Sequence, residues 1–377
     1  MLAVSALSFL CFGVMLVLVG ANQAVLAREL GLDLASTGML ASSLALGAGV
    51  GITVAGPAYD RLRRGEMMAA SASLVAVSLG SMPIDVTAGG AALRIAVAGL
   101  GAGAYNTVVN ASVGERFGAR AGRPLAFIHS LATVGAMAGP LLVAWIVARY
   151  PWVWSFRLVG AAHLVVALGA LARRGDYPPP NTNADARRSR WPEMSALAPF
   201  LAIVFAYVAV EGTTTVFAVA YAVDHLGLSE ARGQLAISAL WLGVLASRLG
   251  LITSPRPLGP RALAVAGTMG TAVLVSFVAF DLHFVELAFG LVGAAVGLVY
   301  PLAMALLGER FPATRGTAAG LVGGAGAAGA VVVPYLTGVV GDRHGVHRAV
   351  ASLGVWCLLI AFGGLWISRR APDRAAS

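Results

Sequence analysis

Long runs of apolar residues, separated by short polar breaks, fill nearly the whole chain. Breaking the sequence at arginines, prolines and acidic clusters leaves twelve runs close to the ~20 mostly apolar residues of a membrane-spanning helix. These runs cover residues 3–25, 36–57, 67–84, 89–112, 124–147, 156–172, 196–220, 231–252, 262–281, 283–307, 316–340 and 348–368. The pattern predicts an all-α membrane protein with twelve transmembrane helices. We interpret the first run as a spanning helix, not a cleaved signal peptide, because no basic segment precedes it.

The longest polar stretch separates the sixth run from the seventh. Residues 173–195 contain three consecutive prolines and five arginines, a composition typical of a solvated linker. We therefore expect an N-terminal six-helix bundle over residues 1–172, a cytoplasmic linker over 173–195 and a C-terminal six-helix bundle over 196–377.

Composition and charge favour the same class of protein. The chain is 58% hydrophobic and 11% charged, whereas a soluble domain is about 25% charged. The net charge of +9 does not indicate a nucleic-acid partner, because the arginines lie in short breaks between apolar runs and not on one soluble face. With the linker in the cytoplasm, most arginines fall on the cytoplasmic side. This bias predicts a multi-pass protein of the cell membrane with both termini in the cytoplasm.

No cofactor, metal site or disulfide is expected from the sequence. Cys11 and Cys357 lie in apolar runs at opposite ends of the chain. The stretch GAGAAG at 324–329 matches the glycine spacing of a dinucleotide site, but no strand precedes it and it lies within an apolar run.

An internal repeat relates the two halves. The tetrapeptide GERF occurs at 114–117 and again at 308–311, an offset of 194 residues. At this offset several glycines and one proline also match: Gly99 with Gly293, Gly103 with Gly297, Gly122 with Gly316, Gly135 with Gly329, and Pro140 with Pro334. At an offset of 196, the earlier helices match, including Gly47 with Gly243. Two six-helix halves in parallel repeat are typical of one class of secondary transporter.

Pairs of glycines four residues apart recur within the spans. They are Gly47/Gly51, Gly99/Gly103, Gly135/Gly139, Gly293/Gly297 and Gly320/Gly324. Such pairs let helix backbones approach closely in a membrane, where no hydrophobic effect drives association. We expect all five at helix–helix contacts.

On these features the chain resembles the major facilitator superfamily over nearly its full length. The first cytoplasmic loop reads GPAYDRLRRG (56–65), similar to the family loop, although Arg63 stands where the family has glycine. Several stretches resemble the fucose–galactose–glucose proton symporter group: GLGAGAYNTVVN (99–110), FIHSLATVGAMAGP (127–140), YVAVEGTTTVFAVAY (207–221), VGLVYP (296–301) and PYLTGVVGD (334–342). The resemblance implies transport by alternating access.

Two sets of charged residues are candidate gating groups. Asp60, Arg61 and Arg64 match the loop of the family, and the resemblance implies that Asp60 and Arg61 stabilise the outward-open state. The repeated GERF places the other set at the cytoplasmic ends of two helices: Glu115, Arg116, Glu309 and Arg310. They are interfacial anchors or, alternatively, pair as a gate at the cytoplasmic mouth.

Glu211 is the candidate proton-coupling residue, because it lies well inside an apolar run. Ionisable side chains inside a membrane are costly and mark functional pathways, and burial favours the neutral form of a carboxyl group. Tyr207, Thr214 and Thr215 lie three or four residues from Glu211 and share its helix face. No basic residue lies within a turn, so we expect Glu211 to be locally unpaired. The alternative is a structural hydrogen-bonding Glu.

Asn106 and Asn110 are candidate ligands for a hydroxylated solute, since a spacing of four places both on one helix face; the alternative is hydrogen bonding between helices. His129 could titrate, although a satisfied core histidine is the simpler interpretation. The remaining candidate solute ligands are Tyr207, Thr214, Thr215, Asn22, Gln23 and Tyr300.

The sequence thus predicts a monomeric secondary transporter whose partners are a small solute, protons and membrane lipid. We expect proton-coupled uptake of a sugar or small polar organic solute. The first alternative is proton-driven efflux of a drug or metabolite. The second, a membrane sensor or intramembrane enzyme, is disfavoured because neither a soluble output domain nor a nucleophile–base pair is evident.

Overall fold

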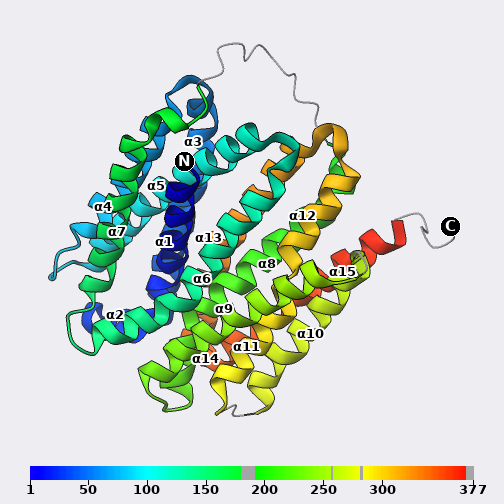
Figure 1. Ribbon diagram of the computed structural model, residues 1–377. Coiled ribbons are helices and arrows are strands. Elements are labelled where there is room, and N and C mark those ends of the chain that lie inside the picture. Colours follow the sequence, from blue (N-terminus) through cyan, green and yellow to red (C-terminus); the bar gives the residue numbers. More distant parts are fainter. Residues whose placement is uncertain (180–191, 256–257, 281–282, 371–377) are drawn as a thin grey trace. The chain divides into compact units, whose positions relative to one another are not determined.

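The protein is described by a computed structural model that covers the chain except residues 180–191, 256–257, 281–282 and 371–377 (Figure 1). The chain divides into two compact units, Met1–Arg187 and Arg188–Ser377, and the boundary falls within the polar stretch at 173–195.

The first unit consists of helices joined by short turns. They are α1 (Leu2–Ala21), α2 (Gln23–Leu30), α3 (Leu34–Arg61), α4 (Arg64–Gly80), α5 (Ala88–Phe117), α6 (Gly122–Val147) and α7 (Val153–Ala172), with 3-10 turns η1 (Gly118–Arg120) and η2 (Arg174–Asp176). Asp33 caps α3 by accepting a 2.7 Å hydrogen bond from the Ser36 amide. The Ser36 side chain and this amide together hold the pKa of the Asp33 carboxyl below its usual value.

The second unit is helical in the same way. Its helices are α8 (Met194–Ala220), α9 (Glu230–Thr253), α10 (Pro260–Ala279), α11 (Val285–Val296), α12 (Val299–Arg310), α13 (Arg315–His344), α14 (Val346–Ser352) and α15 (Gly354–Arg370). A π-helical segment, η3 (Tyr221–His225), continues α8, and a 3-10 turn, η4 (Pro312–Thr314), precedes α13.

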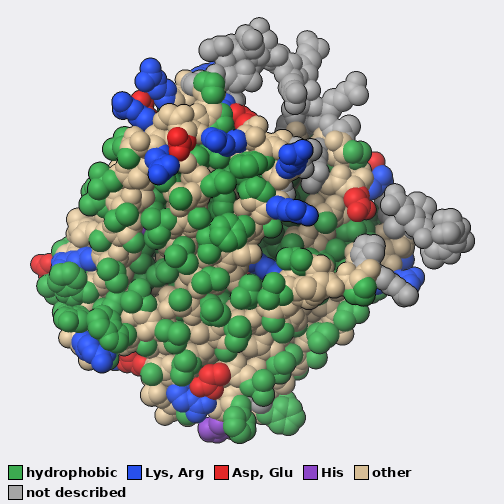
Figure 2. Space-filling view, viewed as in Figure 1, with side chains coloured by type: hydrophobic (Ala, Val, Ile, Leu, Met, Phe, Trp, Pro, Cys, Tyr) green, Lys and Arg blue, Asp and Glu red, His purple; other side chains and the backbone are tan. Residues whose placement is uncertain are grey.

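Each of the twelve apolar runs contains helix in its described residues, which confirms the all-α membrane fold. Among the described residues, eleven helical segments are long and apolar enough to cross a membrane. The run predicted at 67–84 is α4, whose 17 residues span about 26 Å at 1.5 Å per residue, slightly less than the ~30 Å of a bilayer core. Figure 2 shows, on the face drawn, hydrophobic side chains along the helices and charged side chains gathered near helix ends.

The two units pack their helices in the same pairs. In the first unit, α3 packs on α5, α1 on α6, and α4 on α7. In the second, α9 packs on α11, α8 on α13, and α10 on α15. Each pair of one unit therefore corresponds to a pair of the other, as the parallel repeat predicts.

Glycine contacts reproduce the repeat at the level of single atoms. A methyl group at Gly47 would lie 1.9 Å from the carbonyl oxygen of Ala96, and one at Gly243 would lie 2.1 Å from that of Gly290. Ala96 and Gly290 are themselves 194 residues apart in the sequence. Since carbon and oxygen atoms cannot approach this closely, each backbone crossing requires glycine.

The same relation holds for the partner glycines. A methyl group at Gly99 would meet the Leu44 oxygen at 2.2 Å, and one at Gly293 would meet the Leu240 oxygen at 2.0 Å. GERF ends both α5 and α12, and Pro140 and Pro334 both lie inside helices. Four of the five expected glycine pairs lie at close contacts. The expectation for Gly320 and Gly324 is wrong: no described atom lies within 4 Å of a methyl group placed there.

Candidate functional site

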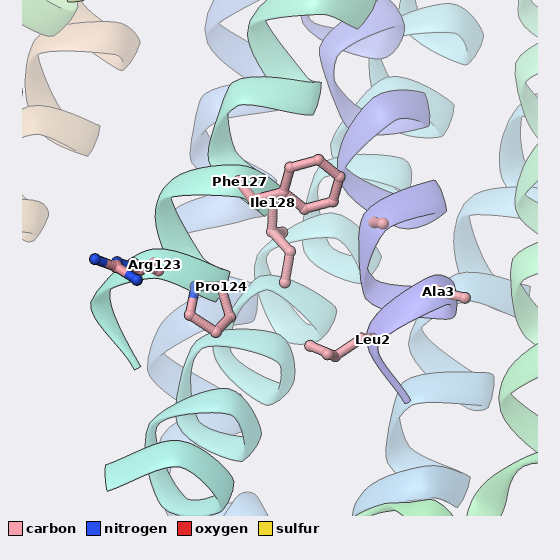
Figure 3. Close-up of a pocket in the computed structure, with 7 residues that line it drawn as sticks. Leu2, Ala3, Arg123, Pro124, Phe127 and Ile128 are labelled. Carbon is pink, nitrogen blue, oxygen red and sulfur yellow. The ribbon is translucent and has the colours of Figure 1, made fainter. Parts of the chain in front are cut away.

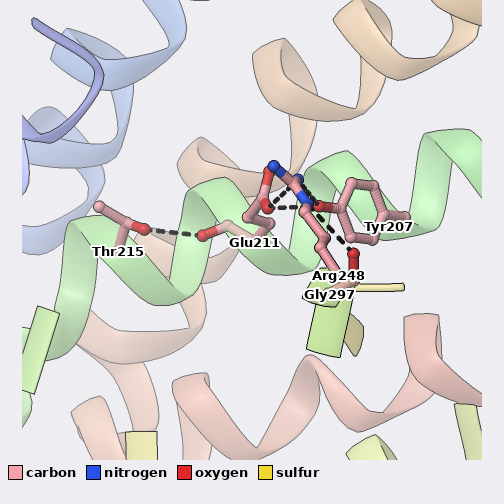
Figure 4. Close-up of polar contacts among 5 residues, drawn as sticks. All are labelled: Tyr207, Glu211, Thr215, Arg248 and Gly297. Carbon is pink, nitrogen blue, oxygen red and sulfur yellow. Dashed lines mark hydrogen bonds and ion pairs between the residues drawn. The ribbon is translucent and has the colours of Figure 1, made fainter. Parts of the chain in front are cut away.

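Glu211 lies in the middle of α8, and hydrogen bonds run along its face of that helix. The Tyr207 hydroxyl, one turn earlier, donates to the Glu211 carboxylate. One turn later, the Thr215 hydroxyl donates to the backbone oxygen of Glu211 at 2.9 Å (Figure 4). The predicted polar face therefore exists at these three residues. Thr214 does not join it, because its buried hydroxyl has no hydrogen-bond partner among the described residues.

Arg248 of α9 supplies the cation that the sequence did not reveal. Its Nη2 lies 3.4 Å from Glu211 Oε1 and donates to the Tyr207 hydroxyl oxygen at 2.9 Å (Figure 4). The Glu211 and Arg248 side chains are only 14% and 27% exposed. The expectation of an unpaired Glu211 is therefore wrong, because the partner comes from a neighbouring helix and not from α8 itself.

A helix break explains another contact of Arg248. The run predicted as one helix at 283–307 is divided into α11 and α12 at Gly297 and Leu298. In an unbroken helix the Gly297 carbonyl would accept from the amide of residue 301, but that residue is Pro301, which has no amide hydrogen. Arg248 Nε donates to this carbonyl at 3.3 Å (Figure 4). The same guanidinium thus satisfies the freed carbonyl and the Glu211 carboxylate.

Tyr300 lies beside this cluster. Its ring centre is 6.0 Å from that of Tyr207, with the two planes tilted by 35°. We define the coupling network as Tyr207, Glu211, Arg248 and Tyr300. All four belong to the second unit.

The first unit has a different, amide-based network on α5 and α6. Asn110 Nδ2 donates to Asn106 Oδ1 at 2.8 Å, and His129 Nε2 lies 3.0 Å from Asn110 Oδ1. That contact requires a proton on Nε2, because the amide oxygen accepts. Asn106 Nδ2 has no protein partner in the part of the chain that the structure describes. We call Asn106, Asn110 and His129 the amide network; it keeps a donor available for a ligand.

His129 differs from the expected core histidine. Its side chain is exposed, with the Phe9 ring edge-on at 4.8 Å between centres. Asn22 and Gln23 are instead buried, at 1% and 2% exposure. The Asn22 amide donates to Leu18 O at 2.8 Å and to Ser155 Oγ at 3.0 Å, so it joins α1 to α7. This arrangement favours a structural role over solute binding for Asn22.

A buried histidine was missed by the sequence reasoning. His163 on α7 is fully buried; its Nε2 lies 3.3 Å from the Tyr105 hydroxyl and its Nδ1 lies 2.8 Å from Val159 O. A histidine inside the run at 156–172 was the available signal. Both ring nitrogens have partners, so the pair joins α5 to α7.

The candidate gating residues make contacts within the first unit. Arg64 is buried and forms an ion pair with Glu115. Arg116 donates to the Asp176 carbonyl at 2.7 Å. Arg61 is exposed, and the side chain of Asp60 lies outside the described part of the structure.

The corresponding residues of the second unit are simpler. Glu309 and Arg310 are exposed at the end of α12. Neither forms an ion pair with another described residue. Pairing of the GERF segments as a gate stays a prediction.

A separate apolar cavity lies between α1 and α6. It has a volume of about 420 Å³ and is lined by Leu2, Ala3, Ala6, Arg123, Pro124, Phe127 and Ile128 (Figure 3). None of the candidate solute ligands contributes to it. With one charged side chain at its edge, this cavity lacks the polar groups that would orient a hydroxylated solute.

The fold and the two networks define a multi-pass membrane protein built from a duplicated helical bundle, with a glutamate–arginine ion pair held inside the spans of one copy. The family model of the Major Facilitator Superfamily matches residues 3–256 and 200–377. The chain belongs to this superfamily and is one of its transporters.

Relatives and solved structures agree with this assignment. The "Uncharacterized MFS-type transporter YfkL" of Bacillus subtilis (strain 168) is 22% identical over 371 residues, which cover 93% of this chain and 91% of YfkL. The structure of a D-xylose-proton symporter matches with a TM-score of 0.77 and 16% identity, over 99% of this chain and 97% of that chain. That of the nucleoside transporter NupG matches with a TM-score of 0.72 and 16% identity, over 98% of each chain. At these identities the structural matches show the fold alone.

Proposed function

We propose that this transporter takes up a sugar or another small polar organic solute by alternating access, driven by protons. The observation that carries the proposal is the Glu211–Arg248 ion pair inside the spans, at 3.4 Å with Tyr207 bonded to both partners. Ionisable groups at this depth are costly and mark ion or proton pathways.

The coupling network offers two states that differ by one proton. With Glu211 ionised, its charge is balanced by Arg248. Protonation removes that balance, because a neutral carboxyl attracts a guanidinium far less than a carboxylate does. The Arg248 side chain then retains its bonds to Tyr207 and Gly297. A transporter can link this change to the conformation that exposes the solute, provided that the two states differ in proton affinity.

The amide network supports the choice of solute class. Asn106, Asn110 and His129 offer neutral donors and acceptors, which suit hydroxyl groups better than they suit a fully charged ligand. Asn106 Nδ2, which has no partner among the described residues, leaves part of this network available. The xylose and nucleoside transporters with similar folds give solutes with which to begin a test, without assigning either solute to this chain.

Direction, location and assembly are part of the same proposal. Arginine distribution favours a cell-membrane protein with cytoplasmic termini, and we propose that it acts as a monomer with lipid around it. Efflux of a drug or metabolite is the alternative, and it would use the same Glu211 chemistry in the opposite direction.

Counterflow in proteoliposomes tests the solute class. Vesicles loaded with one unlabelled sugar, nucleoside, amino acid or drug are diluted into the labelled form of the same compound. We expect transient accumulation with at least one hydroxylated solute, and retained counterflow in Glu211→Gln. Counterflow with apolar drugs only would contradict the uptake proposal and favour efflux.

A further inference from the structure

Besides the apolar cavity between α1 and α6, the first unit has a polar cavity at the start of α4. This cavity lies apart from both networks. Its volume is about 300 Å³. Its lining includes three arginines and one buried tyrosine: Arg63, Arg64, Arg174 and Tyr177, together with Gly65 and Glu66. Nothing in the proposed transport chemistry uses this cavity.

Arg64 enters the cavity with hydrogen-bonding capacity to spare. Its side chain is 1% exposed, and one terminal nitrogen, Nη1, is paired with Glu115. The guanidinium carbon lies 4.2 Å from the centre of the Tyr59 ring. Nε and Nη2 are buried and have no hydrogen-bond partner among the described residues. Buried donors without acceptors are costly, so two such nitrogens on one guanidinium indicate a place for an acceptor.

Tyr177 presents a second donor of the same kind. Its hydroxyl is buried and unpartnered within the described part of the chain. Burial raises the pKa of this phenol above its ordinary value, so the hydroxyl carries its proton at any physiological pH. The cavity therefore contains hydrogen-bond donors from two separate segments, one on each side of the α4–η2 contact.

The helix start adds to this donor set. Arg63 precedes α4 without capping it through its side chain, and the amides of a first helical turn favour an anion. Gly65 brings η2 close, because a methyl group there would lie 2.6 Å from Arg174 Cα. The acidic lining residue, Glu66, lies 3.5 Å from exposed Arg63.

We infer that this cavity binds a phosphate group, supplied either by an anionic phospholipid headgroup or by a soluble phosphate compound. Three arginines, a tyrosine and a helix start line one small volume. Planar guanidinium groups match the oxygens of phosphate. Binding would satisfy the two free nitrogens of Arg64 and connect α4 to η2.

Thermal unfolding of the full-length protein in an uncharged detergent tests the inference. Inorganic phosphate and, separately, phosphatidylglycerol are titrated, with phosphatidylcholine as the lipid control. We expect a saturable rise in the unfolding midpoint. A response to phosphatidylglycerol alone identifies a lipid headgroup site; a response to phosphate, with or without the lipid, shows that the free anion suffices. No saturable response to either probe overturns the inference.

Two variants link the response to this cavity without disturbing the Arg64–Glu115 pair. Arg174→Gln, on an exposed side chain, should raise the half-saturating probe concentration by about tenfold through loss of a charged hydrogen bond. Tyr177→Phe should raise it by about threefold. Arg149→Gln, an exposed arginine between α6 and α7, is the matched control and should leave it unchanged. Equal responses in all four proteins would contradict the site.

Discussion

The two units share their packing but not their polar chemistry. At the offset of 196 residues, Tyr207, Glu211 and Arg248 of the second unit correspond to Cys11, Met15 and Ile52 of the first. Met15 is buried, and Ile52 is 47% exposed. Three members of the coupling network thus lack a charged counterpart, and the fourth, Tyr300, corresponds to Asn106 of the amide network.

The amide network of the first unit likewise lacks an amide counterpart in the second, at the offset of 194 residues. Asn106, Asn110 and His129 correspond to Tyr300, Met304 and Gly323 in the second unit. Four glycine crossings, by contrast, are reproduced: Gly47, Gly99, Gly103 and Gly135 correspond to Gly243, Gly293, Gly297 and Gly329, and all eight lie at close contacts. A duplicated bundle is therefore constrained where backbones touch, whereas side chains elsewhere can diverge, so each unit contributes a different chemistry: neutral hydrogen bonding from the first and charge from the second.

Adding or removing a proline in the paired helices should show the largest difference in stability between the units. Thr107 is the counterpart of Pro301, and α5 is unbroken where the second unit divides into α11 and α12. Thr107→Pro removes an amide hydrogen and so frees a backbone carbonyl in α5. No arginine can donate to that carbonyl, because Ile52 stands where Arg248 would be. We expect a loss of about 3 kcal/mol or more in unfolding free energy, measured by titration with sodium dodecyl sulfate.

Pro301→Ala is the matched reverse change. It returns an amide hydrogen to the Gly297 carbonyl, and we expect it to be neutral or to stabilise by about 1 kcal/mol. Similar losses in both variants would show that the two units tolerate a break equally.

Removing the cation of the coupling network should lower the unfolding free energy nearly as much as Thr107→Pro does. Arg248→Gln leaves Glu211 without its partner, and we expect a loss on the order of 3 kcal/mol, since one member of a largely buried pair remains. The double variant Arg248→Gln/Glu211→Gln should recover most of this loss. Arg261→Gln, at an exposed position of α10, is the control and should change stability by less than about 0.5 kcal/mol. A single variant as stable as the wild type would refute the pairing.

The glycine crossings should behave alike in both units. Gly47→Ala and Gly243→Ala each place a methyl group about 2 Å from a backbone oxygen, so we expect similar losses of at least about 1–3 kcal/mol. Gly320→Ala, where no described atom lies within 4 Å, should instead stabilise the helix by ~0.5–1 kcal/mol. Unequal losses of stability in Gly47→Ala and Gly243→Ala would show that the two crossings are not equivalent in packing.

The amide network should affect solute affinity and not stability. Asn110→Ala interrupts the chain from His129 to Asn106, and we expect the half-saturating solute concentration in counterflow to rise about fivefold, equivalent to ~1 kcal/mol. Its counterpart Met304→Ala should change that concentration by less than about twofold. A larger effect of Met304→Ala than of Asn110→Ala would indicate that the solute ligands lie in the second unit.

Sequence patterns revealed the features that depend on periodicity. Apolar runs predicted the helices, and the register of Gly47, Gly99, Gly243 and Gly293 predicted where backbones cross, because small residues at fixed spacing have a direct packing consequence. Gly320 and Gly324 have the same spacing without such a contact in the described structure, so spacing alone does not establish one.

Contacts across helices were harder to predict. Arg248 is 37 residues from Glu211, and helix periodicity relates only residues of the same helix. Its position near the end of an apolar run suggested an orientation signal and not a partner. Pro301 did contain a usable signal, since a proline inside a predicted span frees a carbonyl four residues earlier, and a nearby donor is then expected.

Solute-dependent proton movement tests the central claim most directly. Weakly buffered proteoliposomes that contain the wild-type protein are given a solute identified by counterflow, and the external pH is recorded with the solute taken up. We predict alkalinisation that accompanies wild-type uptake, and none in Glu211→Gln, although this variant still exchanges labelled solute. The same pH change per solute in Glu211→Gln as in the wild type would contradict the account and leave Glu211 as a structural partner of Arg248.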